Sequence, residues 1–158
     1  AMGSYEKVIL KFPAIPDLLK GIPGMFDVTA VLNKHMGEFQ NLESYNEIAQ
    51  PVIVGTVHGA TARRLQSDKT TAVAEVTAIL KKNIPGLPDP VDSFVTDWTS
   101  NPLTLGSYSQ WPPHLTVKDK LALQEPVKSQ KGALLLFAGE GTQICDLGTV
   151  HGAMLSGL

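Results

Sequence analysis

The 158-residue sequence contains a single cysteine, Cys145. One thiol cannot form an intrachain disulfide, and no set of cysteines and histidines has the spacing of zinc ligands. We therefore expect no metal site. A lone thiol also suits a reducing environment, so we expect an intracellular protein and leave its compartment open.

Long apolar runs and an excess of one charge are also missing. No apolar run approaches the roughly 18 residues that a membrane-spanning helix needs. The net charge is -2, and the basic pairs at 63–64 and 81–82 are isolated. We therefore expect neither nucleic acid nor a membrane as a partner. With 43% hydrophobic and 18% charged residues, the composition is typical of a folded domain with a core.

Alternation of side chains predicts the first strand. Val8, Leu10 and Phe12 fall on one face of the segment 6–12. The sequence predicts further strands over 25–33, 51–59, 91–99 and 132–140, with a turn over 33–38. Two of these strands, 51–59 and 132–140, are apolar on both faces, which indicates that they are buried.

One helix is predicted clearly, over residues 69–83. Ser67 and Asp68 are candidate N-caps, and Asn83 and Pro85 end the helical pattern. Its apolar face consists of Val73, Val76, Ile79 and Leu80. Residues 100–130 are rich in Pro, Ser and Gly, so no long element is expected there, and a second helix begins near residue 149.

The C-terminal segment has the pattern of a strand, a glycine-rich turn and a helix. Unpaired N–H groups at a helix start, here residues 148–152, favour a phosphate group. Glu140 follows the predicted strand and could accept hydrogen bonds from a ribose. Many α/β proteins have this pattern for packing alone, so the pattern by itself leaves both interpretations open.

A set of motifs makes the second half more specific. In order, they are Trp98, Pro102, Gly106-Ser107-Tyr108-Ser109, Phe137-Ala138-Gly139-Glu140, Thr149-Val150-His151-Gly152-Ala153 and Ser156-Gly157. In order and spacing they resemble the C-terminal part of flavin-containing amine oxidases. This family includes polyamine oxidases, monoamine oxidases and lysine-specific histone demethylases.

The resemblance implies an oxidase that uses FAD. The flavin would take a hydride from the carbon beside a substrate nitrogen, the imine would hydrolyse, and oxygen would reoxidise the flavin to give hydrogen peroxide. The substrate would be a polyamine, a monoamine or a lysine side chain, and the sequence does not distinguish these.

The resemblance also implies roles for individual residues. Gly139 and Glu140 would lie against the FAD, and Thr149 and Val150 would present backbone to its flavin and pyrophosphate region. Trp98 would pack against the flavin, although it could simply fill the core.

Two further residues would act on the substrate side. Lys7 matches the lysine that holds a water beside the reactive flavin nitrogen, and we treat it as the catalytic candidate. Tyr108 would form one wall of an aromatic cage for the amine. The alternatives are a solvated Lys7 and a structural hydroxyl donor at Tyr108. Leu103 occupies a position that is often aromatic in the family, which weakens the cage.

The sequence lacks one family feature, the G-x-G-x-x-G motif that holds the FAD pyrophosphate. We therefore expect FAD to be bound by a complete protein, with the remainder of the oxidase domain as a partner, and this chain alone to be inactive. The alternative is a truncated or degenerate module that acts in binding or scaffolding. A swapped or edge-paired dimer would cover the apolar C-terminal strand.

These arguments predict an α+β fold with a mixed, mostly antiparallel sheet of the substrate-domain type and packed helices. The expected divisions are a tag remnant at 1–4, a substrate-domain-like region at 5–99, a connection at 100–131, and a fragment of an α/β FAD-binding domain at 132–158.

Overall fold

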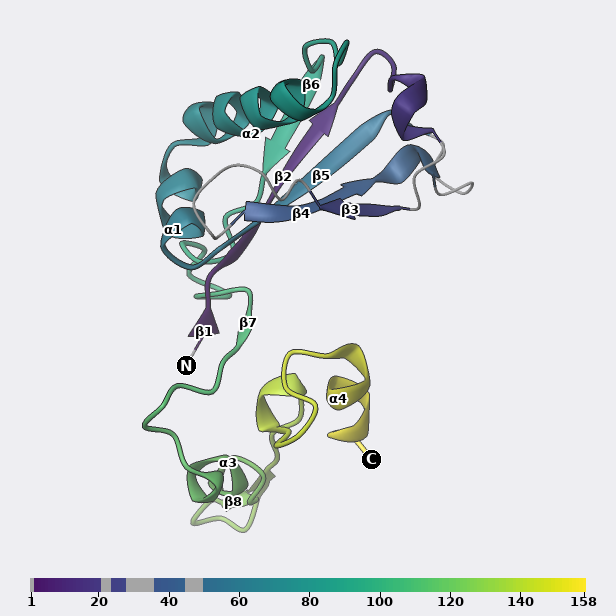
Figure 1. Ribbon diagram of the computed structural model, residues 1–158. Coiled ribbons are helices and arrows are strands. Elements are labelled where there is room, and N and C mark those ends of the chain that lie inside the picture. Colours follow the sequence, from purple (N-terminus) through teal and green to yellow (C-terminus); the bar gives the residue numbers. More distant parts are fainter. Residues whose placement is uncertain (1, 21–23, 28–35, 45–49) are drawn as a thin grey trace. The chain divides into compact units, whose positions relative to one another are not determined.

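The computed structural model describes residues 2–20, 24–27, 36–44 and 50–158 (Figure 1). It has two compact units, Ser4–Ser107 and Met2–Gly3 with Tyr108–Leu158. The elements in the first unit are β2 (Tyr5–Lys11), η1 (Asp17–Leu19), β3 (Met25–Asp27), β4 (Met36–Asn41), η2 (Leu42–Ser44), β5 (Val52–His58), α1 (Gly59–Ser67), α2 (Lys69–Asn83) and β6 (Asp92–Val95). Those in the second are β1 (Met2–Gly3), β7 (Tyr108–Ser109), α3 (Val117–Ala122), β8 (Val127–Lys128), β9 (Leu134–Leu135), η3 (Glu140–Thr142) and α4 (Val150–Leu155).

A five-stranded sheet organises the unit Ser4–Ser107. Its strand order is β3-β4-β5-β2-β6, and the neighbouring strands among the described residues are all antiparallel. Val8 on β2 faces Gly55 on β5 and Val95 on β6. The α+β class and the antiparallel character predicted from the sequence are confirmed, as are the strands at 6–12 and 51–59.

The core lies between this sheet and helices α1 and α2, which cover one of its faces (Figure 1). Val8, Leu10 and Phe12 are buried, as their alternation along β2 predicted. From α2, Val76, Ile79 and Leu80 are buried against them, and Val73 is partly buried. Burial of these aliphatic groups removes apolar surface from water, which stabilises the unit.

Helix α2 begins and ends where its sequence predicted. The Asp68 side chain caps it by accepting a hydrogen bond from the Thr71 N–H at 3.0 Å. Ser67, the other cap candidate, instead ends α1 and donates its hydroxyl to the Arg64 carbonyl. Helix α1 was not predicted, because its sequence GATARRLQS buries only Ala62 and Leu65.

The sequence predicted a turn over 33–38, but its last three residues, 36–38, belong to a strand. Met36–Asn41 forms strand β4 and pairs with β5, with an irregular register between Met36 and Phe39. Residues 33–35, and most of the predicted strand 25–33, lie outside the described residues. The ring of Phe39 packs over Gly55, where a Cβ would lie 2.8 Å from the ring. This contact needs a glycine in β5 and fixes β4 beside it.

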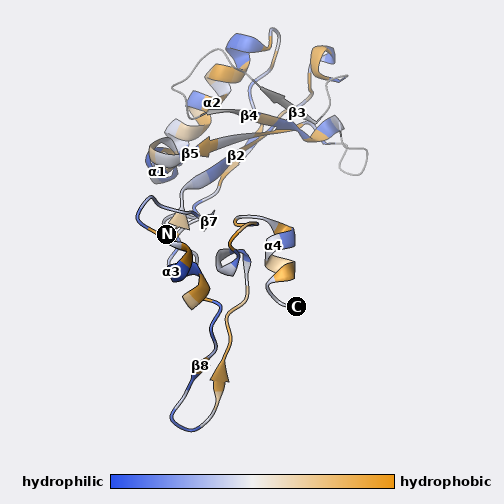
Figure 2. Cartoon of the chain, turned by 60° about the horizontal axis from the view of Figure 1, so that its bottom comes forward, coloured by the Kyte–Doolittle hydropathy of each residue, from blue (hydrophilic) through white to orange (hydrophobic). Residues whose placement is uncertain are grey.

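Two other predicted strands are much shorter in the structure. Of 91–99, only Asp92–Val95 is strand, so Trp98 lies in the turn that follows. Of 132–140, only Leu134–Leu135 is strand, and it pairs with β8. The prediction that this segment is buried is wrong. Its apolar residues are exposed, Leu136 to 67%, and Figure 2 shows the apolar arm of this hairpin. An apolar strand is buried only when other strands or helices cover it.

Residues 2–4, which were set aside as a tag remnant, take part in the structure. Met2 and Gly3 pair with Ser109 and Tyr108 in the second unit. In the first unit, Ser4 is buried, and its carbonyl accepts the Gly59 N–H at 2.9 Å.

Candidate functional site

The turn at Gly139 leaves space beside the backbone of the predicted cofactor segment. Gly139 has φ +140°, and a Cβ placed there would meet no atom within 4 Å. Its N–H donates a hydrogen bond to the Ser156 hydroxyl oxygen at 2.7 Å. The backbone is therefore fixed while one side of it stays free for close approach by another group.

The carboxylate of the next residue, Glu140, joins its own motif to the Gly-Ser-Tyr-Ser motif and to Gly148, the residue before the Thr-Val-His-Gly-Ala motif. Oε1 accepts the Ser109 N–H at 2.8 Å, and Oε2 accepts the Gly148 N–H at 2.6 Å. Burial raises the pKa of Glu140, but these N–H groups and the nearby Lys120 ammonium outweigh it, so the pKa lies below its usual value. The side chain is therefore ionised near neutral pH and acts as an internal clamp.

Lys120 supports the same turn from helix α3. Only 3% of this lysine is exposed. Its Nζ donates to the Gly141 carbonyl and lies 5.9 Å from the centre of the Trp111 ring. A buried ammonium needs such partners, because it has left water. Sequence reasoning missed Lys120, since a lysine in a polar six-residue helix looks solvated.

Thr149 caps helix α4. Its Oγ1 accepts the Gly152 N–H at 3.0 Å and donates to the Asp146 carbonyl at 2.7 Å. A Cβ on Gly152 would collide with that same carbonyl. The glycine of the motif is thus required by packing within this turn. The Val150 side chain is 88% exposed.

Tyr108 lies on β7 and is half-buried. Its hydroxyl oxygen accepts a hydrogen bond from Gln110 Nε2 at 3.1 Å. A Cβ on Gly148 would lie 3.4 Å from its ring, so Tyr108 belongs to the cluster around Glu140. Leu103, at the position that is often aromatic in the family, is exposed.

The other two predicted residues, Lys7 and Trp98, lie in the unit Ser4–Ser107. Lys7 is exposed on β2, and Trp98 is 45% exposed. The two are connected through hydrogen bonds of Thr96 and Glu6. The predicted site residues therefore divide into a Glu140 cluster in one unit and a Lys7–Trp98 pair in the other.

Glu6 is a second residue that sequence reasoning missed. It is fully buried and accepts hydrogen bonds from the segment 96–99. A signal was present, because Glu6 falls on the same strand face as Val8, Leu10 and Phe12. A charged residue on an apolar face indicates a paired side chain.

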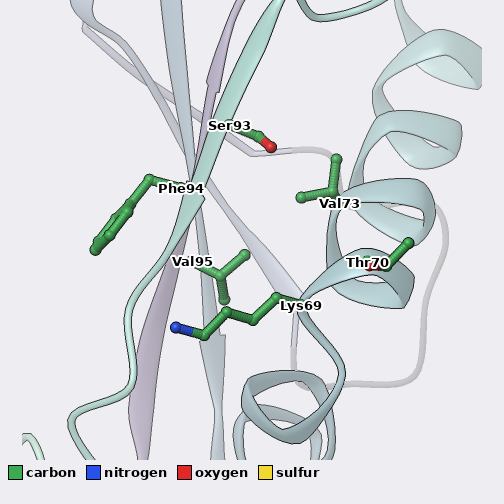
Figure 3. Close-up of a pocket in the computed structure, with 6 residues that line it drawn as sticks. All are labelled: Lys69, Thr70, Val73, Ser93, Phe94 and Val95. Carbon is green, nitrogen blue, oxygen red and sulfur yellow. The ribbon is translucent and has the colours of Figure 1, made fainter.

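A pocket of about 320 Å³ lies between α2 and β6. Figure 3 shows Ser93 and Val95 on the side of α2 and Phe94 on the other side of the strand. The Lys69 ammonium at its edge pairs with Asp97 at 3.6 Å and lies 6.0 Å from the Phe94 ring centre. None of the predicted site residues lines this pocket.

In the described part of the chain, no group of three or more His, Cys, Asp or Glu side chains could hold a metal ion. None of the helices there is long and apolar enough to cross a membrane.

Comparison with known proteins identifies the family. A family model described as flavin containing amine oxidoreductase matches residues 1–158. The chain belongs to this family. It is 33% identical to polyamine oxidase 1 of Zea mays over 99% of its length, and 32% identical to lysine-specific histone demethylase 1 homolog 3 of Arabidopsis thaliana over 99%. The chain is also 36% identical, over 99% of its length, to lysine-specific histone demethylase 1 homolog 2 of Oryza sativa subsp. japonica.

This chain spans only part of each relative. It covers 31% of the maize polyamine oxidase, 20% of the rice demethylase and 10% of the Arabidopsis demethylase. The resemblance predicted from the motifs is confirmed, and so are the terms amine oxidase, flavoprotein and oxidoreductase for the family.

Proposed function

We propose that this chain is part of a FAD-dependent amine oxidase and supplies its substrate-domain sheet and its C-terminal cofactor contacts. The observation that carries this proposal is the Glu140 clamp. One carboxylate joins the Gly-Ser-Tyr-Ser segment, the Gly-Glu turn and the turn before Thr149. Through these hydrogen bonds, Glu140 holds the backbone of the three segments together.

The residues present fit a bound dinucleotide. The open side of Gly139, the exposed Val150 and the turn held by Thr149 are features against which such a group could rest. Glu140 has both oxygens engaged inside the unit, so we assign it the task of shaping the turn. When bound, FAD supplies a hydride acceptor.

The remaining assignments follow the family. Lys7, exposed on a rigid strand, would hold a water by hydrogen bonding through its ammonium group. Trp98 would exclude water from one side of the flavin, and Tyr108 would contact the amine. The substrate would be a polyamine, a monoamine or a lysine side chain, whose C–N bond becomes an imine with release of hydrogen peroxide.

A second candidate function is a binding or scaffolding module. It is favoured by the lack of a G-x-G-x-x-G motif anywhere in the chain, because this motif supplies the pyrophosphate contacts in dinucleotide-binding folds. The chain by itself would then be inactive and would not take up FAD.

An absorbance spectrum followed by FAD titration separates the two candidates. A flavin band near roughly 450 nm in the purified chain, or saturable binding of added FAD, supports the oxidase assignment. Amine-dependent peroxide release from a longer protein that contains this chain would then be measured. A colourless chain with no affinity for FAD would mean that the chain by itself is a substrate-domain piece or a scaffold, and peroxide release by the longer protein would then separate the two. Gly139→Val, which fills the open side of the turn and strains its backbone at φ +140°, should abolish flavin binding. Gly132→Val, at a glycine of the same segment with φ +81° and an equally open Cβ position, should not.

A further inference from the structure

Glu6 is a buried acid at the N-terminal end of the core-facing side of β2. It is 0% exposed and shares the core side of β2 with Val8 and Leu10. An unpaired carboxylate in this place would be very costly. Its hydrogen-bond partners therefore show what it is there to hold.

Its hydrogen-bond partners among the described residues come from the segment just after β6. Oε2 accepts the Thr96 hydroxyl at 2.5 Å and the Trp98 N–H at 3.1 Å. Oε1 accepts the Thr99 N–H at 2.9 Å and the Thr99 hydroxyl at 3.0 Å. A carboxylate has about four acceptor positions and no donor, so these donors saturate it. The carboxylate fixes the main chain on both sides of the Trp98 α-carbon.

Thr96 extends this network to Lys7. Its hydroxyl donates to Glu6 and accepts the Lys7 N–H at 2.8 Å, and its own N–H donates to the Lys7 carbonyl at 3.0 Å. The main chain at Lys7 is thus bonded to Thr96 on both its polar groups. One side chain, Glu6, lies at the centre of a network that includes Lys7 and Trp98.

We propose that Glu6 is a positioning residue that sets Trp98 and Lys7 in a fixed mutual arrangement for the flavin. This proposal rests on the function proposed above, in which these two residues face the cofactor. An apolar residue at position 6 would fill the same core space. It would leave the backbone N–H groups of Trp98 and Thr99 without their acceptors. Hydrogen bonding thus explains an acid at a position where the strand pattern favours an aliphatic residue.

Amide hydrogen exchange in the whole chain, followed by NMR, tests the network without any flavin. Glu6→Gln keeps the size of the side chain but places an NH₂ group against donors. The Trp98 and Thr99 amides should then exchange about tenfold faster, while the β2–β5 amides stay protected. Glu75→Gln is the matched control, since Glu75 is a hydrogen-bonded carboxylate on α2 that pairs with Arg64. Unchanged exchange at Trp98 and Thr99 would overturn the proposal.

A second variant covers the case in which Glu6→Gln does not fold. Thr96→Val keeps the shape of the side chain and removes the hydroxyl between Lys7 and Glu6. The Lys7 amide should then exchange about tenfold faster, because it loses its acceptor. The Trp98 amide, which bonds to Glu6 directly, should stay protected. If the Lys7 amide also keeps its protection, Thr96 does not link Lys7 to Glu6 and the proposal fails.

Flavin binding distinguishes positioning from a purely structural role. In a Trp111→Phe background, quenching of Trp98 fluorescence by added FAD reports on this residue alone. Glu6→Gln should weaken the apparent FAD affinity about tenfold, and Glu75→Gln should leave it unchanged. If the Trp98 and Thr99 amides exchange faster in Glu6→Gln while FAD affinity and Trp98 quenching stay unchanged, Glu6 does not position Trp98 for the flavin. If the wild-type chain does not bind FAD, the titration is made on the longer protein that contains it, and absence of flavin binding there would contradict the proposed function. The exchange rates in the chain would still decide whether Glu6 holds Trp98.

Discussion

The Oε2 atom of Glu140 accepts the backbone N–H of Gly148 at 2.6 Å. This bond closes the loop between the Gly-Glu turn and the start of α4, and the other carboxylate oxygen holds Ser109 of β7. Three segments therefore depend on one side chain. A carboxylate does this better than an amide, because bonds from N–H groups to a charged acceptor are stronger than those to a neutral one.

Glu140→Gln should destabilise the unit that contains it. The carboxamide can accept only through one oxygen, so either the Ser109 or the Gly148 N–H loses its partner. We expect the free energy of unfolding to fall by about 1–3 kcal/mol. Urea unfolding followed by Trp111 fluorescence in a Trp98→Phe background measures it. Glu125→Gln, a change at an exposed acid of the same unit, should have almost no effect. Equal effects of the two variants would show that Glu140 is not a clamp.

The contribution of Glu140 should also depend on pH. Its pKa in the folded chain is lowered, because the N–H bonds from Ser109 and Gly148 and the charge of Lys120 outweigh the opposing effect of burial. The unfolded chain, with a pKa of about 4.3, takes up the proton first as pH falls. The stabilisation is therefore complete above that pH and is lost as pH falls through the folded pKa. The gap in unfolding free energy between wild type and Glu140→Gln should shrink from pH 7 to roughly pH 3. A constant gap would contradict this account.

Much of the first unit was predictable because its elements have strong local patterns. Strand β2 alternates, β5 is continuously apolar, and α2 has a cap and an apolar face. Strand β4 and helix α1 were missed for a physical reason. Their places are set by tertiary packing, such as Phe39 over Gly55, and such packing leaves little trace in the local sequence.

The candidate site was predictable to a lesser degree. The motifs identified the family and the segment around Glu140. The sequence pattern indicated that the helix start at 148–152 favours a phosphate group, yet Gly152 is required there by the Asp146 carbonyl of its own turn. The supporting residues Glu6 and Lys120 stayed hidden because their partners are 90 and 21 residues away in the sequence. Only a folded chain shows such pairs.

Lys120→Met should loosen the same turn. Methionine can fill the space of the lysine stem, but it cannot donate to the Gly141 carbonyl or interact as a cation with Trp111. We expect a loss of about 1–2 kcal/mol in the free energy of unfolding. Thermal unfolding by circular dichroism is the measurement. Lys118→Met on the exposed side of the same helix serves as the control. A gain in stability for Lys120→Met would show that desolvation of the buried ammonium destabilises the fold by more than its hydrogen bond to Gly141 and its contact with Trp111 stabilise it.

Gly55→Ala tests the packing of β4 on β5. The new Cβ would lie 2.8 Å from a ring carbon of Phe39 and 3.3 Å from a Val76 methyl, both in the core. Because Phe39 is fully buried, its ring cannot move away freely. We expect a loss of about 1–3 kcal/mol in the free energy of unfolding. Gly157→Ala, where the Cβ would make an ordinary contact, should leave stability unchanged. A matching loss in both variants would point to a general effect of replacing glycine.

The exposed run Leu134–Phe137 should make the isolated chain associate. Its side chains are 51–67% exposed, and β9 has β8 as its partner on one edge in the described structure. An apolar strand with an open edge attracts a further strand, either from another copy or from the remainder of an oxidase domain. We expect sedimentation velocity to show association that grows with concentration. Leu136→Lys should suppress it, because a charge in the run must be buried when chains pair. Leu103→Lys alters a 92% exposed leucine outside the run and should not. If both variants associate as the wild type does, the contact lies elsewhere on the chain.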